Sequence, residues 1–287
     1  MNDRLGLGWR PPLASGILTH QHRVDVIEII ADDYFDASRR ELARLKTLAA
    51  QIPVVLHGVS LGMASAAPVD AKRLDRMARL VEAIEPEYWS EHLAFVRGGG
   101  TEIGHLAAPP RTAATIAGTL KNLETATAIV GSKPLVENIA SLIDPPGSTL
   151  GEAEWVATIL RESNCSMLFD LHNVYANAVN FGFEVQTYFE TLPVEHIKAL
   201  HLAGGRWVRS REYPESRRLL DDHLHQVPLP VFDLLREVGK QVPHPLTVIL
   251  ERDGNFPEIR VLLDELEQAR TTLKQGRESG LLRPLKV

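Results

Sequence analysis

Cysteine, long apolar runs and surplus positive charge are all missing or scarce in this 287-residue chain. Cys165 is its one cysteine, so no internal disulfide can form, which is typical of proteins from a reducing compartment. No apolar run reaches the roughly 20 residues of a membrane-spanning helix, and the first residues carry no apolar signal core. We therefore expect a cytoplasmic protein that does not bind membranes.

The charge balance also disfavours a nucleic-acid partner. The chain has 31 Lys and Arg against 37 Asp and Glu, a net charge of −6, which gives no basic field to hold phosphates. A glycine-rich turn after the first strand is missing too, because Gly6 and Gly8 lie inside that strand. This disfavours an open, doubly wound nucleotide-binding sheet.

Eight short apolar segments, each typical of a strand buried on both faces, alternate with helical patterns along the chain. The expected strands are 5–9, 24–30, 53–56, 88–90, 134–136, 166–169, 197–200 and 246–250. The expected helices are 37–50, 70–84, 112–130, 152–161, 231–240 and 257–274, with a short one at Tyr188.

This alternation predicts an α/β fold of the (β/α)8 TIM-barrel class, for which about 250 residues is a typical length. No change of composition marks a linker, so we expect residues 1–287 to form a single domain with a polar C-terminal tail from about residue 275. The stretch from 204 to 230 looks irregular.

Six of the expected strands run into polar side chains that can bind metal ions. These residues are His57, His92, Glu137, Asp170, Asn173, His201 and Glu251. The carboxyl ends of parallel barrel strands open on one face, so we expect these groups to converge. Asp221 and His223, two residues apart in the loop after the seventh strand, can face the same way if that loop is extended.

These nine groups exceed the four to six or so ligands of one ion and predict two or three ions, with Glu137 as a candidate bridge. Imidazole and carboxylate ligands without a thiolate favour iron, manganese or zinc, and composition does not choose among them. Each residue alone would more often be structural. Purely structural polar residues, however, would scatter over both ends of the strands.

The sequence also predicts roles for other residues near these strand ends. Arg252 and Asp253 follow Glu251 and are our candidates for catalytic residues that hold a ligand or a substrate carboxylate. His172 could face the same mouth or pack on a loop, and both possibilities stay open. Glu28 lies within the second strand and would need a buried partner, whereas we expect His225 to be solvated.

Seven motifs resemble those of the multinuclear non-heme iron-dependent oxidative enzymes, the family of the oxidase of methanobactin biosynthesis. They are LHGVSLG (56–62), SEHLAF (90–95), VENIAS (136–141), FDLHNVYANAVN (169–180), KALHLAGG (198–205), DDH (221–223) and ERDGNFP (251–257). They follow the family's order over nearly the whole chain. The resemblance implies a xylose-isomerase-like TIM barrel in which the same nine residues hold two or three irons.

The resemblance also implies a function. It points to an oxidase that uses O2 to modify a residue, most often cysteine, of a ribosomally synthesised precursor peptide. A small partner protein that binds the peptide's leader would form a heterodimer with it. The chain departs from the family where Gly205 replaces a usual His, where His172 replaces a usual Asn, and where Asp32 and Asp33 replace a Glu-Asn pair. These departures leave the nine ligands intact and concern the outer part of the site.

Three other functions fit part of the pattern. A zinc- or manganese-dependent hydrolase or endonuclease would use similar ligands, but the basic surface that DNA requires is missing. A sugar isomerase would use one or two divalent ions with a Lys or His for proton transfer, and no lysine follows the fifth or sixth strand. A metal-binding scaffold would not need so many open ligands.

Overall fold

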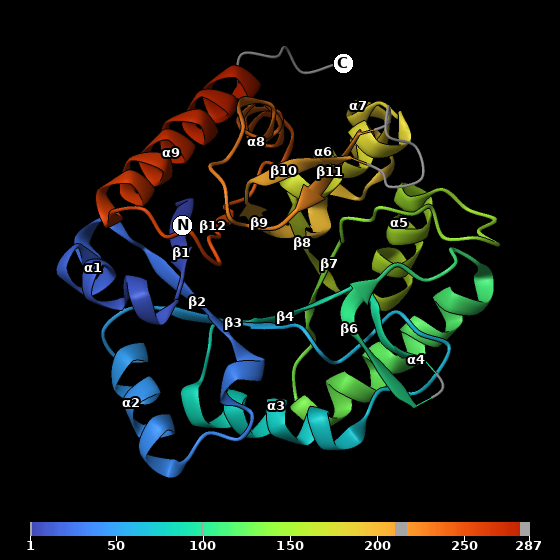
Figure 1. Cartoon of the computed structure of the whole chain (residues 1–287), viewed down its shortest axis with the longest axis horizontal. Coiled ribbons are helices and arrows are strands. Elements are labelled where there is room, and N and C mark those ends of the chain that lie inside the picture. The colour runs from blue at the N-terminus through green and yellow to red at the C-terminus, as the bar shows by residue number, and fades with distance from the viewer. Residues whose placement is uncertain (1, 99, 210–216, 282–287) are drawn as a thin grey trace.

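A computed structural model describes residues 2–98, 100–209 and 217–281 of the chain, and eight parallel strands close a barrel at its centre (Figure 1). In order around the barrel these are β1 (Arg4–Gly8), β2 (Val26–Ile30), β3 (Val54–Gly58), β4 (Trp89–His92), β7 (Leu135–Glu137), β8 (Ser166–Asp170), β9 (Ile197–Leu202) and β12 (Thr247–Leu250). All eight expected strands are present. The (β/α)8 fold class is therefore confirmed.

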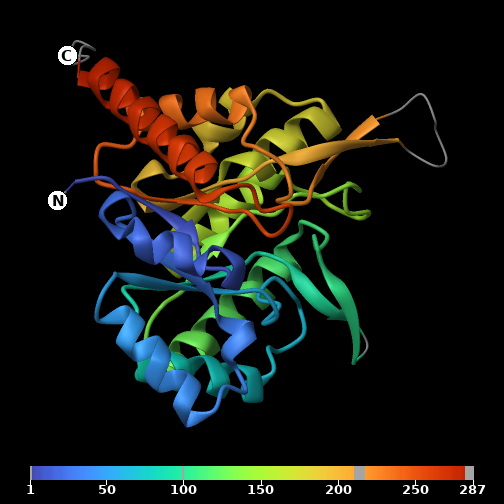
Figure 2. The same cartoon turned by 60° about the vertical axis from the view of Figure 1, so that its left-hand side comes forward.

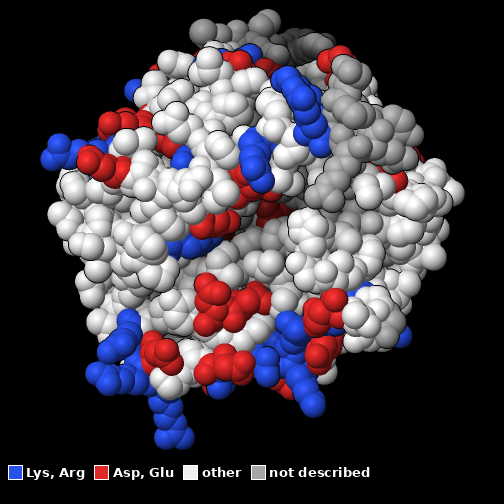
Figure 3. All heavy atoms as spheres, viewed as in Figure 1, with Lys and Arg blue, Asp and Glu red and all other residues white. Residues whose placement is uncertain are grey.

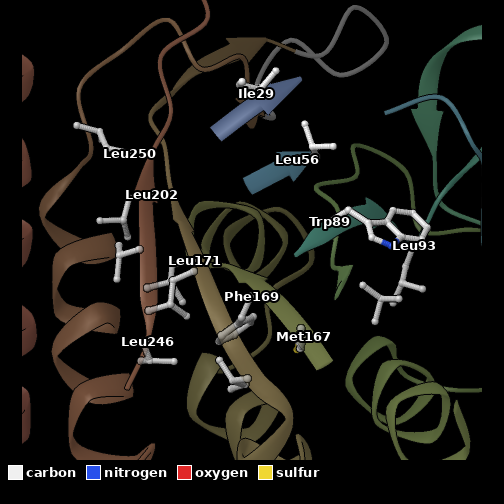
Figure 4. Close-up of a cluster of buried hydrophobic side chains, with 14 of the residues drawn as sticks. Ile29, Leu56, Trp89, Leu93, Met167, Phe169, Leu171, Leu202, Leu246 and Leu250 are labelled. Atoms are coloured by element: carbon white, nitrogen blue, oxygen red, sulfur yellow. The ribbon is translucent and has the colours of Figure 1, made fainter. Parts of the chain in front are cut away.

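Helices surround the barrel and bury its outer surface. They are α1 (Ala14–Thr19), α2 (Arg39–Ala49), α3 (Ala71–Ile84), α4 (Ala113–Val130), α5 (Glu152–Ser163), α6 (Leu171–Phe181), α7 (Val185–Thr191), α8 (Leu229–Gln241) and α9 (Ile259–Leu281). Figure 4 shows part of the core, with Met167 and Phe169 on β8 and Leu202 and Leu250 on neighbouring strands. None of the helices in the described part of the chain is long and apolar enough to cross a bilayer.

Side chains alternate across each strand, so every second residue points into the barrel. Small apolar clusters fill part of the interior, and Tyr88 packs against both of them. Their members are Val26, Val55, Ile249, Leu135, Leu168 and Ala199. Two positions further along the same six strands come Glu28, His57, Glu251, Glu137, Asp170 and His201. The alternation therefore places a layer of polar side chains next to a layer of apolar side chains, with the polar layer at the carboxyl end of the barrel.

Two antiparallel hairpins stand on this face. The pair β5 (Phe95–Gly98) and β6 (Thr101–Ala107) follows β4, and the pair β10 (Gly205–Arg209) and β11 (Arg217–Asp221) follows β9. Figure 2 shows both on the same side of the molecule, away from the termini. The expectation of an irregular stretch from residue 204 was wrong for β10 and β11. These short, arginine-rich strands pair only with each other and lack the apolar pattern of barrel strands.

The C-terminal helix also differs from expectation, since α9 continues to Leu281 and no tail begins near residue 275. Its last turns pack closely on α8: a Cβ added to Gly276 would lie 2.3 Å from the Arg236 carbonyl oxygen. Arg277 is paired with Asp3 at 2.7 Å, which fixes the helix beside the start of the chain. Glycine at the contact and arginine beside it make this segment look polar and unstructured in the sequence.

Replacing Gly276 with valine should lower the free energy of unfolding by about 1–3 kcal/mol, because overpacking would force α8 and α9 apart. Gly98→Val is the matched control, since nothing lies within 4 Å of a Cβ added at Gly98. Urea unfolding of both variants measures the difference. Equal midpoints for the two variants would show that the helices do not meet as closely as described.

Candidate metal centre

Glu137, at the end of β7, lies among three imidazoles from three other strands. Its Oε2 is 3.5 Å from His57 Nε2 and 3.4 Å from His92 Nε2, and its Oε1 is 3.2 Å from His201 Nδ1. All four residues are buried, and the His57 and His92 rings have centroids 4.6 Å apart. Four of the predicted ligands thus meet at one point.

Hydrogen bonds behind the rings set which nitrogen faces the carboxylate. His57 Nδ1 donates to Ser90 Oγ at 2.8 Å, and this hydroxyl donates in turn to a backbone carbonyl at 3.3 Å. His92 Nδ1 lies 3.2 Å from the Gly58 carbonyl oxygen, to which it can only donate. In their neutral forms both rings therefore present a lone pair on Nε2 to the same carboxylate. Such an arrangement needs a proton or a metal ion between the groups.

The buried carboxylate of Glu28 orients His201. The sequence alone had not indicated a partner for Glu28. His201 donates from its Nε2 to Glu28 Oε2 at 2.8 Å, and neither side chain is exposed. Its Nδ1 then points to Glu251 Oε2, at 3.0 Å, and to Glu137. A carboxylate that holds the outer nitrogen of a histidine is the usual support for a histidine that binds metal.

A second group forms where β8 passes directly into α6. Asp170 caps the helix, its Oδ1 accepting from the Asn173 backbone N–H at 2.6 Å. Asn173 Nδ2 donates to the Asn138 carbonyl at 3.0 Å. This leaves Asp170 Oδ2 and Asn173 Oδ1 buried, with no hydrogen-bond partner among the described residues. Cap formation thus frees one oxygen of each side chain for an ion.

The end of β11 and the loop after it bring two more expected ligands to this group, Asp221 and His223. His223 has a left-handed backbone conformation, with φ of 54°, which is uncommon for a residue with a side chain. Its Nε2 is 3.0 Å from Asp221 Oδ2, and its Nδ1 is 3.0 Å from Asp253 Oδ2 and 3.7 Å from Glu251 Oε2. The hairpin and the loop after it therefore close one side of the mouth, and they place potential metal ligands there.

Among the residues that the structure describes, three overlapping sets of side chains have ligand atoms within 4.8 Å of one another. They are His57, Glu137 and His201; Glu28, His201 and Glu251; and Asp170, His223 and Glu251. His201 and Glu251 each belong to two sets. The donors are imidazole nitrogens and carboxylate oxygens, which suit iron, manganese or zinc. The geometry fits neighbouring ions better than one isolated ion.

Protons balance the charges of this buried group when no cation does. Burial lowers the pKa of His92, but the carboxylates of Glu137 and Glu91 outweigh it and raise this pKa to about 9. Burial and the nearby carboxylates of Asp221 and Glu137 raise the pKa of Asp170 well above its usual range. A bound metal ion would displace such protons, because histidine and carboxylate ligands bind it in their deprotonated forms.

The two residues that we expected to be catalytic are separated in the structure. Asp253 lies at the mouth, with its side chain 41% exposed, beside His223. Arg252 points away and lies 3.5 Å from Glu265 of α9. The guanidinium that meets Asp253 belongs to Arg10, whose Nε donates at 2.8 Å. Arg10 directly follows the first expected strand, so the strand-end rule would have found it had cations been considered.

Glu91 is a second residue that we missed. It is fully buried on β4, where its Oε1 accepts from the His92 backbone N–H at 2.9 Å and its Oε2 from the Leu61 N–H at 3.1 Å. It thus supports the loop after β3 that carries part of the LHGVSLG motif. Its position next to His92 was visible in the sequence, but nothing there distinguished a supporting carboxylate from a ligand.

The face that holds these groups is hollowed at its middle, and acidic atoms are visible at the opening (Figure 3). Exposure falls from Asp253 at the rim to Glu28, Asp170 and His201, which are completely buried. A substrate would therefore approach from the side on which the hairpins stand.

Residues 4–274 match the sequence model of a family described as "RiPP precursor modification enzyme MbnB/TglH/ChrH", where RiPP denotes a ribosomally synthesised and post-translationally modified peptide. The chain belongs to this family. The resemblance drawn from the motifs is thereby confirmed. Membership makes the protein one of a family of enzymes that act on peptide precursors.

Two relatives show how far the similarity extends. A UPF0276 protein of Acaryochloris marina is 33% identical over 273 residues, which cover 95% of each chain. A UPF0276 protein of Streptomyces avermitilis is 35% identical over 278 residues, which cover 94% of this chain and 55% of that one.

Solved structures with similar folds are distant in sequence. Endonuclease IV from Thermus thermophilus has a TM-score of 0.59 at 14% identity, over 95% of this chain and 99% of its own. An L-ribulose 3-epimerase has a TM-score of 0.59 at 13% identity, over 99% of both chains. A fusion protein with a xylose isomerase-like TIM barrel has a TM-score of 0.65 at 13% identity, over 99% of this chain and 46% of its own. These identities show a shared fold alone, the xylose-isomerase-like TIM barrel.

Glu137→Gln should reduce bound metal by at least about half, because this carboxylate faces three imidazoles and its loss removes a shared negative ligand. Glu152→Gln is the matched control, since Glu152 is also a largely buried carboxylate but is held by Asn177 and Tyr188, outside the centre. Elemental analysis of the two purified variants and of the original protein gives the comparison. Equal metal content in both variants would contradict the assignment of Glu137.

Proposed function

We propose that this protein is a multinuclear non-heme iron oxidase that uses O2 to modify a residue, most often cysteine in this kind of enzyme, of a ribosomally synthesised precursor peptide. The observation that supports this most directly is that two potential ligand sets, one with His201 and one with Glu251, adjoin where His201 Nδ1 lies 3.0 Å from Glu251 Oε2. Adjoining sets suit two or three ions side by side. Family membership supplies the peptide substrate.

In this proposal the described residues divide between the ions. His57, His92, Glu137 and His201 would hold one ion, with Glu137 as the carboxylate shared with a neighbouring ion. Asp170, Asn173, Asp221, His223 and Glu251 hold the rest. Ferrous iron bound here would supply the electrons for reduction of O2 and the Lewis acidity that binds a substrate thiolate.

The chain's own groups would control access to this centre. The apolar layer below the ligands, with Tyr88, separates the centre from the amino-terminal end of the barrel. At the mouth Asp253 is held by Arg10 on one oxygen and by His223 on the other. Its partly exposed carboxylate can still accept an N–H from a peptide backbone, and this would orient the substrate above the ligands.

The two hairpins are the natural walls of a peptide channel. They lie on one side of the molecule (Figure 2), where they follow the carboxyl ends of β4 and β9, and Trp207 of β10 is 51% exposed. An exposed indole on a short strand is a suitable contact for a peptide or protein partner. We propose that the precursor, together with a small leader-binding partner protein, binds along this side to form a heterodimer.

A zinc- or manganese-dependent hydrolase or endonuclease on the same barrel is the alternative, and one of the solved structures with this fold is an endonuclease IV. The net charge of −6 argues against DNA, because several phosphate contacts normally require a basic surface. The choice between oxidase and hydrolase depends on the metal.

Purification under anaerobic conditions, followed by metal analysis and Mössbauer spectroscopy, tests the oxidase directly. We expect two or more irons per chain, at least partly ferrous, that are oxidised when O2 is admitted, since the donor set of imidazoles and carboxylates suits iron. Stoichiometric zinc in a protein that does not react with O2 would contradict the proposal.

A further inference from the structure

His172, the second residue of α6, is the one fully buried imidazole that the proposed ligand assignment leaves unused among the described residues. Its Nδ1 lies 2.7 Å from Asp221 Oδ1. A carboxylate accepts hydrogen bonds, so this nitrogen donates and carries the proton. Its Nε2 is buried and has no hydrogen-bond partner within the described ranges. Burying an imidazole this deeply calls for a specific reason.

The structure makes room for this ring with a glycine on the facing hairpin. A Cβ added at Gly205 would lie 2.7 Å from His172 Cε1 and 3.0 Å from its Nε2, both closer than normal contacts. Gly205 is also the residue that pairs with Asp221 in the register of β10 and β11. The base of the hairpin therefore leaves space for the His172 imidazole, which bonds to Asp221, the last residue of β11.

Asp221 needs such a support because its strand is not part of the barrel. Barrel strands are paired on both sides, which fixes the ligands at their ends. In contrast, β11 pairs with β10 alone, and a two-stranded hairpin is marginally stable by itself. Helix α6 supplies a second anchor, since the Asn180 side chain bonds to both the N–H and the carbonyl of Leu219, at 2.7 and 3.0 Å.

We propose that His172 is a positioning residue that fixes the Asp221 carboxylate, and through it His223, at the rim of the metal centre. The hydrogen bond from Nδ1 holds Oδ1, so that Oδ2 is directed to His223 and the ion beside it. Helix α6 begins directly after Asp170, itself a proposed ligand. His172 on this helix therefore fixes the position of the hairpin's proposed ligands relative to those of the barrel. This role rests on the proposed metal centre.

The role makes a selective prediction. Loss of the hydrogen bond should lower the affinity for the ion held by Asp221 and His223 by about 10–100-fold. This is the usual effect of removing a group that supports a metal ligand. The ion at His57, His92 and Glu137 should be retained, since no described contact joins His172 to those side chains. A merely structural histidine would instead change stability and leave the ratio of metal to protein intact.

The test compares His172→Phe and His172→Leu with His172→Asn, all purified anaerobically and loaded with ferrous iron. Phenylalanine keeps the ring and leucine avoids overpacking, but neither can donate, whereas the asparagine amide can replace the Nδ1 donor. We expect the first two to lose part of the iron and to lack one component of the Mössbauer spectrum. His172→Asn should keep both, and Asp221→Asn with His172→Leu should lose no more than Asp221→Asn alone.

Two results would overturn the inference. One is full iron content in His172→Leu and His172→Phe, and the other is a loss of iron in His172→Asn as large as in those two variants. His225→Asn is the control, because His225 is 44% exposed and its Nδ1 lies 2.9 Å from Asp222, which is not among the proposed ligands. Absence of iron from the unmutated protein would be a different failure, that of the proposed oxidase itself.

Discussion

Burial of polar atoms inside a closed barrel is the constraint on which the rest of this structure depends. Each unsatisfied buried polar atom costs about 1–3 kcal/mol by protein measurements, and the whole free energy of unfolding is about 5–15 kcal/mol. Glu137 Oε2, Asp170 Oδ2 and Asn173 Oδ1 are all unsatisfied within the described part of the chain. Protons or metal ions can compensate for them, and the proposed metal centre would supply such positive charge.

Different parts of the fold restrain different residues of the proposed ligand set. Barrel strands fix His57, Glu137 and His201 through pairing on both sides, and groups behind the rings choose which nitrogen faces the centre. The ligands beyond the barrel depend on α6 and on the hairpin, so their positions rest on a few side-chain hydrogen bonds. We expect the barrel-borne part of the centre to be the more rigid and the rim to adapt to the substrate.

Much of this could be read from the sequence because barrel geometry links strand ends to one place. The alternation of apolar segments and helical patterns predicted the fold, and the polar side chains at the ends of six strands predicted the gathering of His57, Glu137 and Glu251. The hairpin β10 and β11 could not be foreseen, since strands that pair only with each other carry a weak pattern. The pairing of Glu28 with His201 was also hidden, because it joins residues far apart in the chain. Arg252 was predicted from its place beside Glu251, yet alternation along the chain turns it outward to Glu265.

The central claim is that the mouth of the barrel holds neighbouring iron ions. Crystals of the anaerobically purified protein, measured above and below the iron absorption edge, test it most directly. We expect two or three anomalous peaks at the carboxyl end of the barrel, one beside His57, His92 and Glu137 and another beside Asp170, His223 and Glu251. A single peak elsewhere on the protein, or no iron signal at this mouth, would refute the proposal of a multinuclear iron centre.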